Sequence, residues 1–315
     1  MRFYEIIFQD SVTGVQIGPP ITTMPRGKFD PNYLNVELDI PVVEMAIPAG
    51  SAFVRIWGIS IATIAQGFNF NGVRILVFGG MSKGLPLANS KQQGLLLQGV
   101  VQNAFGNWQG TTQTLDMIVQ FDGGTVEDEK NLVLAWTAGM KLADAIRSTL
   151  DVAFPGYLYK INISENLVLG HDAPGYYQTI GQFANYVKQA SQDIIGGDYQ
   201  GVSITIRGGT FYVYDGTTPT TPTKIAFIDL IGQPTWLSLF QINFKTAMRG
   251  DIAVGDYIQM PPGQATLSQK SYSQFKQGSV FTGVFQVDKI RHVGNARQPT
   301  ADAWVTVFDA HVVVS

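Results

Sequence analysis

Residues 283–313 read GVFQVDKIRHVGNARQPTADAWVTVFDAHVV, and the prediction of the fold starts from this stretch. Two apolar runs rich in β-branched and aromatic residues, VFQVDKI and AWVTVFDAHVV, flank a polar loop. Runs of this kind, separated by turn residues such as Gly294 and Asn295, predict a β-hairpin. His292 lies at the entrance of the loop and Trp304 at its exit, so His292 either acts as a general base or braces the hairpin.

The first 124 residues carry short apolar runs of the same kind, separated by turn signals such as Asn71-Gly72 and Gly79-Gly80. In residues 34–40, LNVELDI, apolar and polar side chains alternate, as in a strand that is buried on one face. Six such runs at this spacing predict a β-sandwich or a β-barrel. They are FYEIIFQ, LNVELDIPV, FVRIWGIS, VRILVFGG, LLLQGVVQNAF and QTLDMIVQF.

The period of the apolar residues changes after Gly124, where repeats of about four residues predict two amphipathic helices around a strand, YLYKINIS. Pro155-Gly156 ends the first helix and Gly196-Gly197 ends the second. After residue 197 the chain returns to short strands, so the order is β, then α/β, then β. The predicted apolar stripes are Leu142, Ile146, Leu150 and Phe154 in the first helix, and Tyr176, Ile180, Phe183, Val187 and Ile194 in the second.

The composition is poor in charge, with 14% charged residues against about 25% in an average soluble domain. Interface cores are depleted in Lys, Glu and Asp, so this composition suits a protein that neighbours largely cover, or else one with an uncharged polar surface. The net charge is −3 and no block of basic residues occurs, which excludes the usual nucleic-acid footprint. The absence of cysteine excludes disulfides, thiolate nucleophiles and zinc–thiolate sites.

The N-terminus, MRFYEIIFQD, lacks the basic and apolar regions of a signal peptide. The longest apolar run, RIWGISIATIA from Arg55, is too short and interrupted to span a membrane. We therefore expect a soluble protein that is made in the cytosol.

The motif Gly80-Met81-Ser82-Lys83-Gly84 fits the G-x-S-x-G pattern of a serine hydrolase. That pattern requires a helix immediately after the serine, whereas the chain continues LPLANSKQQG without an apolar stripe. Gly79 and Gly84 also have the spacing of a phosphate-binding loop, but Leu85 stands where its lysine belongs. Neither motif therefore predicts chemistry.

The three histidines, His171, His292 and His311, do not have the spacing of metal ligands. Asp251 and Asp256 flank a turn, and we interpret them as solvated turn residues rather than a catalytic pair. His292 has no catalytic neighbour in the sequence, so we interpret it as a polar residue that braces the hairpin. The sequence thus predicts no enzyme and no catalytic, cofactor-binding or metal-binding residue.

The C-terminal part resembles the closing domain of phage baseplate hub proteins. The resemblance lies in IGQPTWLSLFQINFKTAMRGDIAVGDYIQMP at 231–261, followed after a variable loop by residues 283–310. In that family a Gly-Asp turn leads into the strand formed here by Asp256-Tyr257-Ile258. A later strand ends in a histidine, here His292, and returns after a loop through an aromatic strand, here at Trp304.

The segment with LADAIRSTLDVAFPG, the second helix and TFYVYDG is similar to the α/β insert of the hub family. The resemblance covers most of residues 130–315 and, weakly, the first 125. It implies a mainly β fold with an α/β insert, in which two tube-like antiparallel β-barrel domains (1–125 and 199–315) are separated by a small α/β domain (126–198). The chain is short for the family, and a peptidoglycan-cleaving domain is not seen.

The resemblance also implies a structural role in the virion, in the baseplate of a phage tail. The hub would be a homotrimer whose six barrels match the six-fold tail tube or distal tube protein above, while a central spike protein docks below and other baseplate proteins surround it. DNA would pass through the channel without specific binding. Neighbour contacts are expected at the first strands of each β domain and at the loop 263–278, which contains Tyr272 and Phe275.

Two alternatives from other classes remain open at this stage. One is a β-rich tail protein that binds a receptor or carbohydrate, and the other is a serine hydrolase that uses Ser82.

Overall fold

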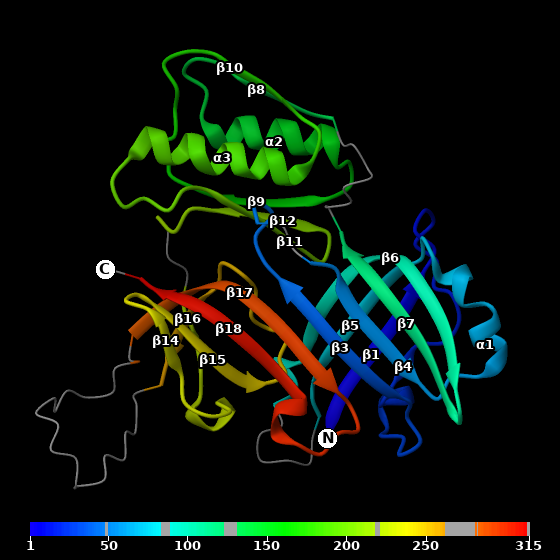
Figure 1. Ribbon diagram of the computed structural model, residues 1–315. Helices are drawn as coiled ribbons and strands as arrows, with labels where there is room; N and C mark the ends of the chain where they lie inside the picture. Colours follow the sequence, from blue (N-terminus) through cyan, green and yellow to red (C-terminus); the bar gives the residue numbers. More distant parts are fainter. Residues whose placement is uncertain are drawn as a thin grey trace, which may run out of the picture.

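The computed structural model describes residues 1–47, 50–82, 89–122, 131–217, 221–261, 281 and 283–313. Figure 1 shows two curled halves of a β-sheet side by side, with an α/β unit above them. Each of the three parts has its own hydrophobic core. The mainly β fold with an α/β insert, predicted from the sequence, is confirmed.

One sheet of thirteen strands runs through both curled halves, in the order β14-β15-β18-β17-β3-β4-β7-β6-β5-β1-β2, with β13 and β16 attached beside β17. All the pairs are antiparallel except β13 with β16. The strands are β1 (Arg2–Gln9), β2 (Ile21–Thr22), β3 (Asn35–Val42), β4 (Ala52–Trp57), β5 (Arg74–Met81), β6 (Gly94–Gln109), β7 (Thr112–Phe121), β13 (Thr223–Lys224), β14 (Thr235–Ser238), β15 (Gln241–Ala247), β16 (Tyr257–Met260), β17 (Gly283–Asn295) and β18 (Trp304–Val312).

Short helical segments connect these strands. They are α1 (Ile61–Ala65) and the 3₁₀ turns η1 (Pro25–Gly27), η2 (Gly67–Phe70), η3 (Ser90–Gln92), η4 (Phe227–Asp229) and η5 (Ala301–Ala303). Within the described ranges, no helix is both long and apolar enough to cross a membrane.

The predicted hairpin exists and lies inside the sheet. β17 pairs with β18 on one side and with β3 on the other, so it joins the last part of the chain to the first. His292 faces Thr306 in β18 and Ile40 in β3. The two β regions are therefore halves of one continuous sheet, a connection that the sequence pattern did not reveal.

Trp304 anchors β18 in the core of the first half. It starts β18, yet its side chain is 2% exposed and lies in the core formed mainly by the first 121 residues. Its indole Nε1 donates to the carbonyl of Gly80 at 2.9 Å, and its ring lies 6.5 Å from that of Tyr4. Only glycine fits at position 294, because a Cβ there would stand 2.6 Å from the indole ring.

Two arginines fasten the loop after β17 to the first half. Arg2 donates to the carbonyls of Asn295 at 2.7 Å and Thr300 at 2.8 Å. The guanidinium of Arg297 stacks 4.4 Å from the ring centroid of Tyr33. The opening stretch is thus attached to the first half by strand pairing, by a buried indole and by its loop.

The α/β unit consists of two helices between two small sheets (Figure 1). Its apolar stripes face the core as predicted, with Ile194 only partly buried. Tyr176 was predicted wrongly: it lies exposed on a strand, because the second helix begins only at Ile180. The elements are β8 (Leu132–Trp136), α2 (Leu142–Ala153), β9 (Leu158–Asn162), β10 (Ala173–Tyr177), α3 (Ile180–Ile195), β11 (Ser203–Arg207) and β12 (Thr210–Tyr214).

The last two strands of this unit follow the boundary expected at residue 198. β12 pairs in parallel with β9 and antiparallel with β11. Ile204, Phe211 and Val213 belong to the same core as the two helices. We propose that the α/β unit extends to about residue 215 rather than ending at residue 198.

Candidate functional site: a buried junction and an apolar sheet edge

His292 is buried, with 3% of its surface exposed. Its Nδ1 lies 2.9 Å from the hydroxyl oxygen of Thr306. That hydroxyl donates to the carbonyl of Arg249 at 3.2 Å, so its proton is already used. Nδ1 must therefore carry the hydrogen and donate it to Thr306, which makes His292 a neutral imidazole that links β17 to β18.

Burial, together with the nearby cation of Arg207, lowers the pKa of His292 from 6.5 to about 3. The unfolded chain binds the proton near the ordinary value, so it takes up the proton before the folded chain does. The contribution of His292 to stability is complete above pH 6.5 and is lost as the pH falls from there toward 3.

We expect this residue to lower the free energy of unfolding by about 2 kcal/mol between about pH 8 and about pH 5, because each pH unit in this window costs about 1.4 kcal/mol. Urea unfolding of the wild type and of His292→Asn at both pH values measures this change in the free energy of unfolding. The variant keeps a donor toward Thr306 but does not titrate, so its smaller pH dependence gives the difference. Equal pH dependence in both proteins would contradict this assignment.

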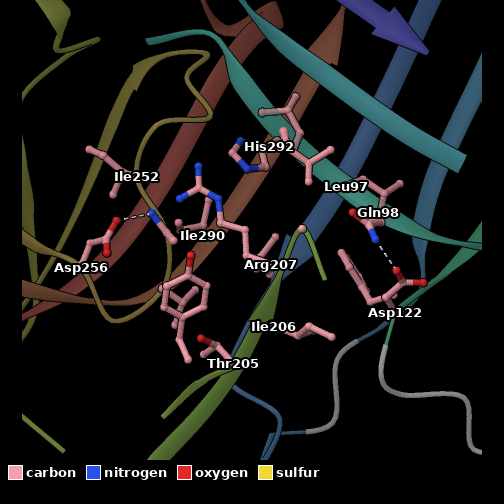
Figure 2. A pocket seen from close by; sticks show the side chains of 18 residues that line it. Leu97, Gln98, Asp122, Thr205, Ile206, Arg207, Ile252, Asp256, Ile290 and His292 are labelled. Atoms are coloured by element: carbon pink, nitrogen blue, oxygen red, sulfur yellow. Dashed lines mark hydrogen bonds between the residues drawn. The ribbon is translucent and has the colours of Figure 1, made fainter. Parts of the chain in front are cut away.

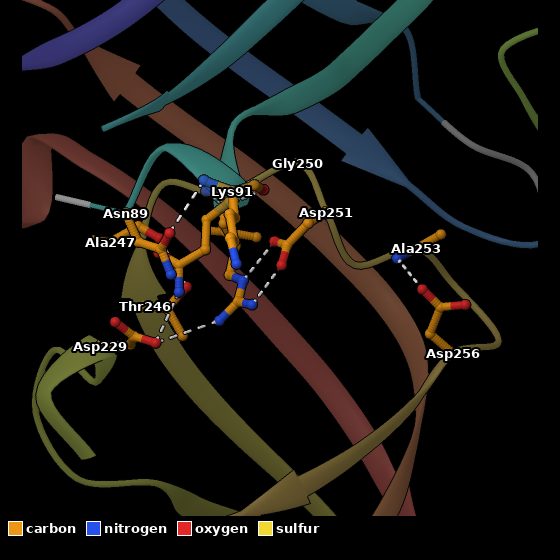
Figure 3. A network of polar contacts seen from close by, with 12 residues as sticks. Asn89, Lys91, Asp229, Thr246, Ala247, Gly250, Asp251, Ala253 and Asp256 are labelled. Carbon is orange, nitrogen blue, oxygen red and sulfur yellow. Dashed lines mark hydrogen bonds and ion pairs between the residues drawn. The ribbon is translucent and has the colours of Figure 1, made fainter. Parts of the chain in front are cut away.

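Arg249 forms a buried ion cluster, and its backbone N–H donates to the hydroxyl of Thr306 that His292 also contacts. Figure 3 shows two acids of this cluster, Asp229 and Asp251. Arg249 is 2% exposed and contacts Asp251 through two hydrogen bonds of 2.7 and 2.6 Å. Its Nη1 makes no hydrogen bond within the described residues and lies 3.6 Å from Asp229. Gln92 of the first half donates to the same carboxylate at 2.8 Å. The cluster therefore joins both halves of the sheet.

Asp251 and Asp256 lie in a turn, as predicted, but both are half-buried against the junction rather than fully solvated. Asp251 pairs with the buried Arg249. Asp256 accepts from the backbone N–H of Ala253 at 2.8 Å, and burial raises its pKa. Both acids are structural partners inside the junction.

A cavity of about 180 Å³ lies where the two halves of the sheet and the α/β unit meet. Figure 2 shows Arg207 of β11 directing its guanidinium toward His292, with Asp256 nearby. Arg207 donates to the carbonyl of Gly250 at 2.5 Å. The residues that line the cavity include Thr205 and Tyr212 but no serine, cysteine or lysine.

The other residues singled out in the sequence lie apart. The hydroxyl of Ser82 donates to the sulfur of Met24 at 3.1 Å. His311 in β18 contacts Asp288 in β17 at 2.6 Å, and His171 is exposed in a loop. Lys83, Gly84, Leu85 and the loop 263–278 with Tyr272 and Phe275 lie outside the described residues. Within the described ranges, no group of three or more potential metal ligands occurs.

A row of exposed apolar side chains forms one end of the large sheet. Residues 227–240 run beside β15: Leu230 bridges to Thr246, and β14 pairs with β15, with no further strand beyond it among the described residues. All four residues of β14 are exposed. We call this segment the β14 edge; its exposed large apolar side chains are Phe227, Ile228, Trp236, Leu237, Leu239 and Phe240.

The β14 edge is large for a surface that faces water. Its side chains are 38% (Trp236) to 80% (Leu239) exposed. At about 150–250 Å² for a large side chain, this amounts to roughly 600 Å² of apolar surface. The largest patch on a typical monomer is about 300–600 Å², and a bare apolar edge strand invites pairing with another chain. At the opposite end, β2 and residues 10–23 fold back on β1, and Val12, Val15 and Ile17 of this segment are exposed.

Neighbour contacts were expected at the first strands of each β region, whereas the described structure exposes its apolar edge at β14. The sequence signal for this edge is the run WLSLF at 236–240, in which apolar and polar residues do not alternate. The cluster around Arg249 carried no signal in the sequence, because Gln92 and Asp229, which hydrogen-bond within it, are 137 residues apart in the chain.

No family model and no curated protein matches the sequence. Three solved structures share the arrangement at low sequence identity. A tail protein from Neisseria meningitidis MC58 superposes with a TM-score of 0.53 at 11% identity, covering 98% of this chain and 96% of that one. The chain has the fold of this tail protein.

The 43 kDa tail protein of prophage MuSo2 from Shewanella oneidensis gives a TM-score of 0.52 at 9% identity, with coverage of 98% and 96%. The Escherichia coli c3393 protein gives 0.53 at 8% identity, with coverage of 90% and 74%. It is described as a component of the type VI secretion system with structural similarity to the T4 tail proteins gp27 and gp5. The resemblance to baseplate hub proteins is thus confirmed at the level of the fold.

Proposed function

We propose that this protein is a structural hub of a phage tail baseplate or of a related injection device. Three copies form a closed ring, in which the two halves of each sheet give six similar units facing a tail tube. A central spike docks on the opposite side, and DNA passes through the middle. The protein has no catalytic step of its own.

The observation that carries this proposal is the bare β14 edge in a chain with the fold of a tail protein. A closed ring covers such an edge with the neighbouring subunit, which removes the danger of uncontrolled pairing. The low charge content fits a protein that neighbours cover on several sides. The lack of a basic block avoids strong binding of the DNA backbone in the channel.

A lysine in the β14 edge tests the proposal. We expect Leu239→Lys to weaken self-association at least about tenfold, because the charge must be buried against an apolar partner surface. The unfolding free energy of the single chain should change by less than about 0.5 kcal/mol, because Leu239 is 80% exposed. Sedimentation velocity over a concentration series measures the assembly.

The matched control is Val152→Lys, since Val152 is 81% exposed on α2 in the α/β unit. It should leave the assembly unchanged. If Leu239→Lys assembles as strongly as Val152→Lys, the β14 edge is not an interface. If the wild type remains a single chain at every concentration, the ring itself is contradicted.

A further inference from the structure

The proposed function makes no use of the cavity of about 180 Å³ at the junction, where the α/β unit meets the sheet. The α/β unit contributes one face of β11 and β12 to its wall. Thr205 lies opposite Tyr212 across this strand pair, and Arg207 is two residues further on, so the three side chains share a face. Ile204 and Phe211 point from the other face into the core of the α/β unit. Strand alternation therefore directs polar side chains toward the cavity.

Two neutral polar groups reach this cavity with hydrogen-bonding capacity left over. The Nδ1 of His292 carries the hydrogen that goes to Thr306, so Nε2 carries a lone pair. Neither this Nε2 nor the hydroxyl of Tyr212 has a hydrogen-bond partner among the described residues, although both residues line the cavity. His292 is 97% buried, since 3% of it is exposed. A buried acceptor of this kind calls for a donor from inside the cavity.

Two charged groups of opposite sign line the same cavity. Arg207 makes one hydrogen bond, to the carbonyl of Gly250, which leaves further N–H donors on its guanidinium. Asp256 accepts one hydrogen bond, from the backbone N–H of Ala253, which leaves an oxygen available. The two charges act on each other through space, and neither group hydrogen-bonds the other. A ligand that satisfies both must accept from the guanidinium and donate to the carboxylate.

This requirement selects the chemistry of the ligand. A hydroxyl group meets it, because its oxygen accepts while its hydrogen is donated. An anion would be attracted by Arg207 but repelled by Asp256, and for a cation the two effects are reversed. A second hydroxyl group on the same molecule can donate to Nε2 of His292. The cavity therefore favours a neutral molecule with at least two hydroxyl groups.

The volume limits the size of this molecule. A cavity of ~150 Å³ holds benzene, so the cavity here takes about six to eight non-hydrogen atoms. Ile252, Val254 and Ile290 belong to the remaining wall, which is apolar and can cover C–H groups. We propose that the junction cavity is a binding site for a small neutral polyol of three or four carbons. This inference goes beyond the proposed function and does not depend on assembly of the ring.

Saturation-transfer NMR with glycerol and the full chain tests the site. We expect a dissociation constant of about 1 mM, well within the limit for a ligand of about six non-hydrogen atoms. Tyr212→Phe removes one hydroxyl and should weaken binding about fivefold. Asp256→Asn keeps an acceptor toward Ala253 but loses the charge, so it should weaken binding about tenfold or more.

The matched control is Tyr176→Phe, which changes an exposed tyrosine on β10 and should bind glycerol like the wild type. Mannitol, with about twelve non-hydrogen atoms, should be excluded by its size. Acetate and methylammonium should each bind more weakly than glycerol. Urea unfolding of each variant separates a loss of binding from a loss of folding, and Tyr212→Phe decides the result if Asp256→Asn does not fold.

Three results would overturn the inference. The first is no saturation transfer from glycerol at about 10 mM in the wild type. The second is equal affinity in Tyr212→Phe, Asp256→Asn and Tyr176→Phe, which would place the bound glycerol outside the cavity. The third is tighter binding of acetate or methylammonium than of glycerol, which would show that one charge dominates the site. None of these results bears on the proposed ring.

Discussion

Replacing Trp304 by alanine is expected to lower the free energy of unfolding by about 3–5 kcal/mol, the usual cost of removing a fully buried large aromatic side chain. The indole fills space between the two halves of the sheet, beside Tyr4, and its Nε1 satisfies the carbonyl of Gly80. Gly294 lies directly against the ring and has no side chain that could fill the cavity. Urea unfolding measures the loss.

Two further variants separate the loss of packing from the loss of the hydrogen bond to Gly80. Trp304→Phe keeps most of the packing but leaves the carbonyl of Gly80 without its donor, so we expect a smaller loss of about 1–3 kcal/mol. Trp108→Ala removes an indole that is 61% exposed and should cost less than about 1 kcal/mol. If Trp304→Ala costs no more than Trp108→Ala, Trp304 does not join the two halves.

Replacing Arg249 by methionine is expected to destabilise the chain by a similar amount, about 3–5 kcal/mol. The guanidinium is the partner of Asp251 and lies 3.6 Å from Asp229. Its removal leaves these carboxylates inside the junction without a cation, and the cost of burying unpaired charge is far larger than that of losing a surface pair. The free energy of unfolding in urea at neutral pH gives the comparison.

The matched control is Arg291→Met, which removes an arginine with the same two-bond geometry toward Asp39 but with a 54% exposed side chain. An exposed pair of this kind contributes at most about 1 kcal/mol. Adding Asp229→Asn and Asp251→Asn to Arg249→Met should restore part of the stability, because it removes the unpaired charges. Equal losses in Arg249→Met and Arg291→Met would show that the cluster is not a buried charge pair.

Patterns in the sequence predicted the features that depend on residues close together in the chain. The hairpin of residues 283–313 and the stripe of Leu142, Ile146 and Leu150 follow from periods of two and about four residues, and both are confirmed. Tyr176 continued the helical period but belongs to β10, because the N-cap Thr179 starts the helix only at Ile180.

Contacts between distant parts of the chain were not predictable in this way. The pairing of β17 with β3 joins Asn295 to Glu37 across most of the sequence, and nothing in either run specifies the partner. The same holds for the cluster around Arg249: Asp229 comes from η4 and Thr306 from β18, and Gln92 of η3 donates to Asp229. The sequence of a turn such as 251–256 shows its polar residues, which suggest exposure to water. It does not show the distant residues against which the turn packs.

Electron microscopy of the purified chain, with class averages calculated without imposed symmetry, tests the central claim most directly. We predict a closed three-fold ring with a central hole and a pseudo-six-fold outline, and we predict that Leu239→Lys abolishes it. Compact single particles of 34.4 kDa at every concentration, unchanged by that substitution, would contradict a ring assembled through the β14 edge.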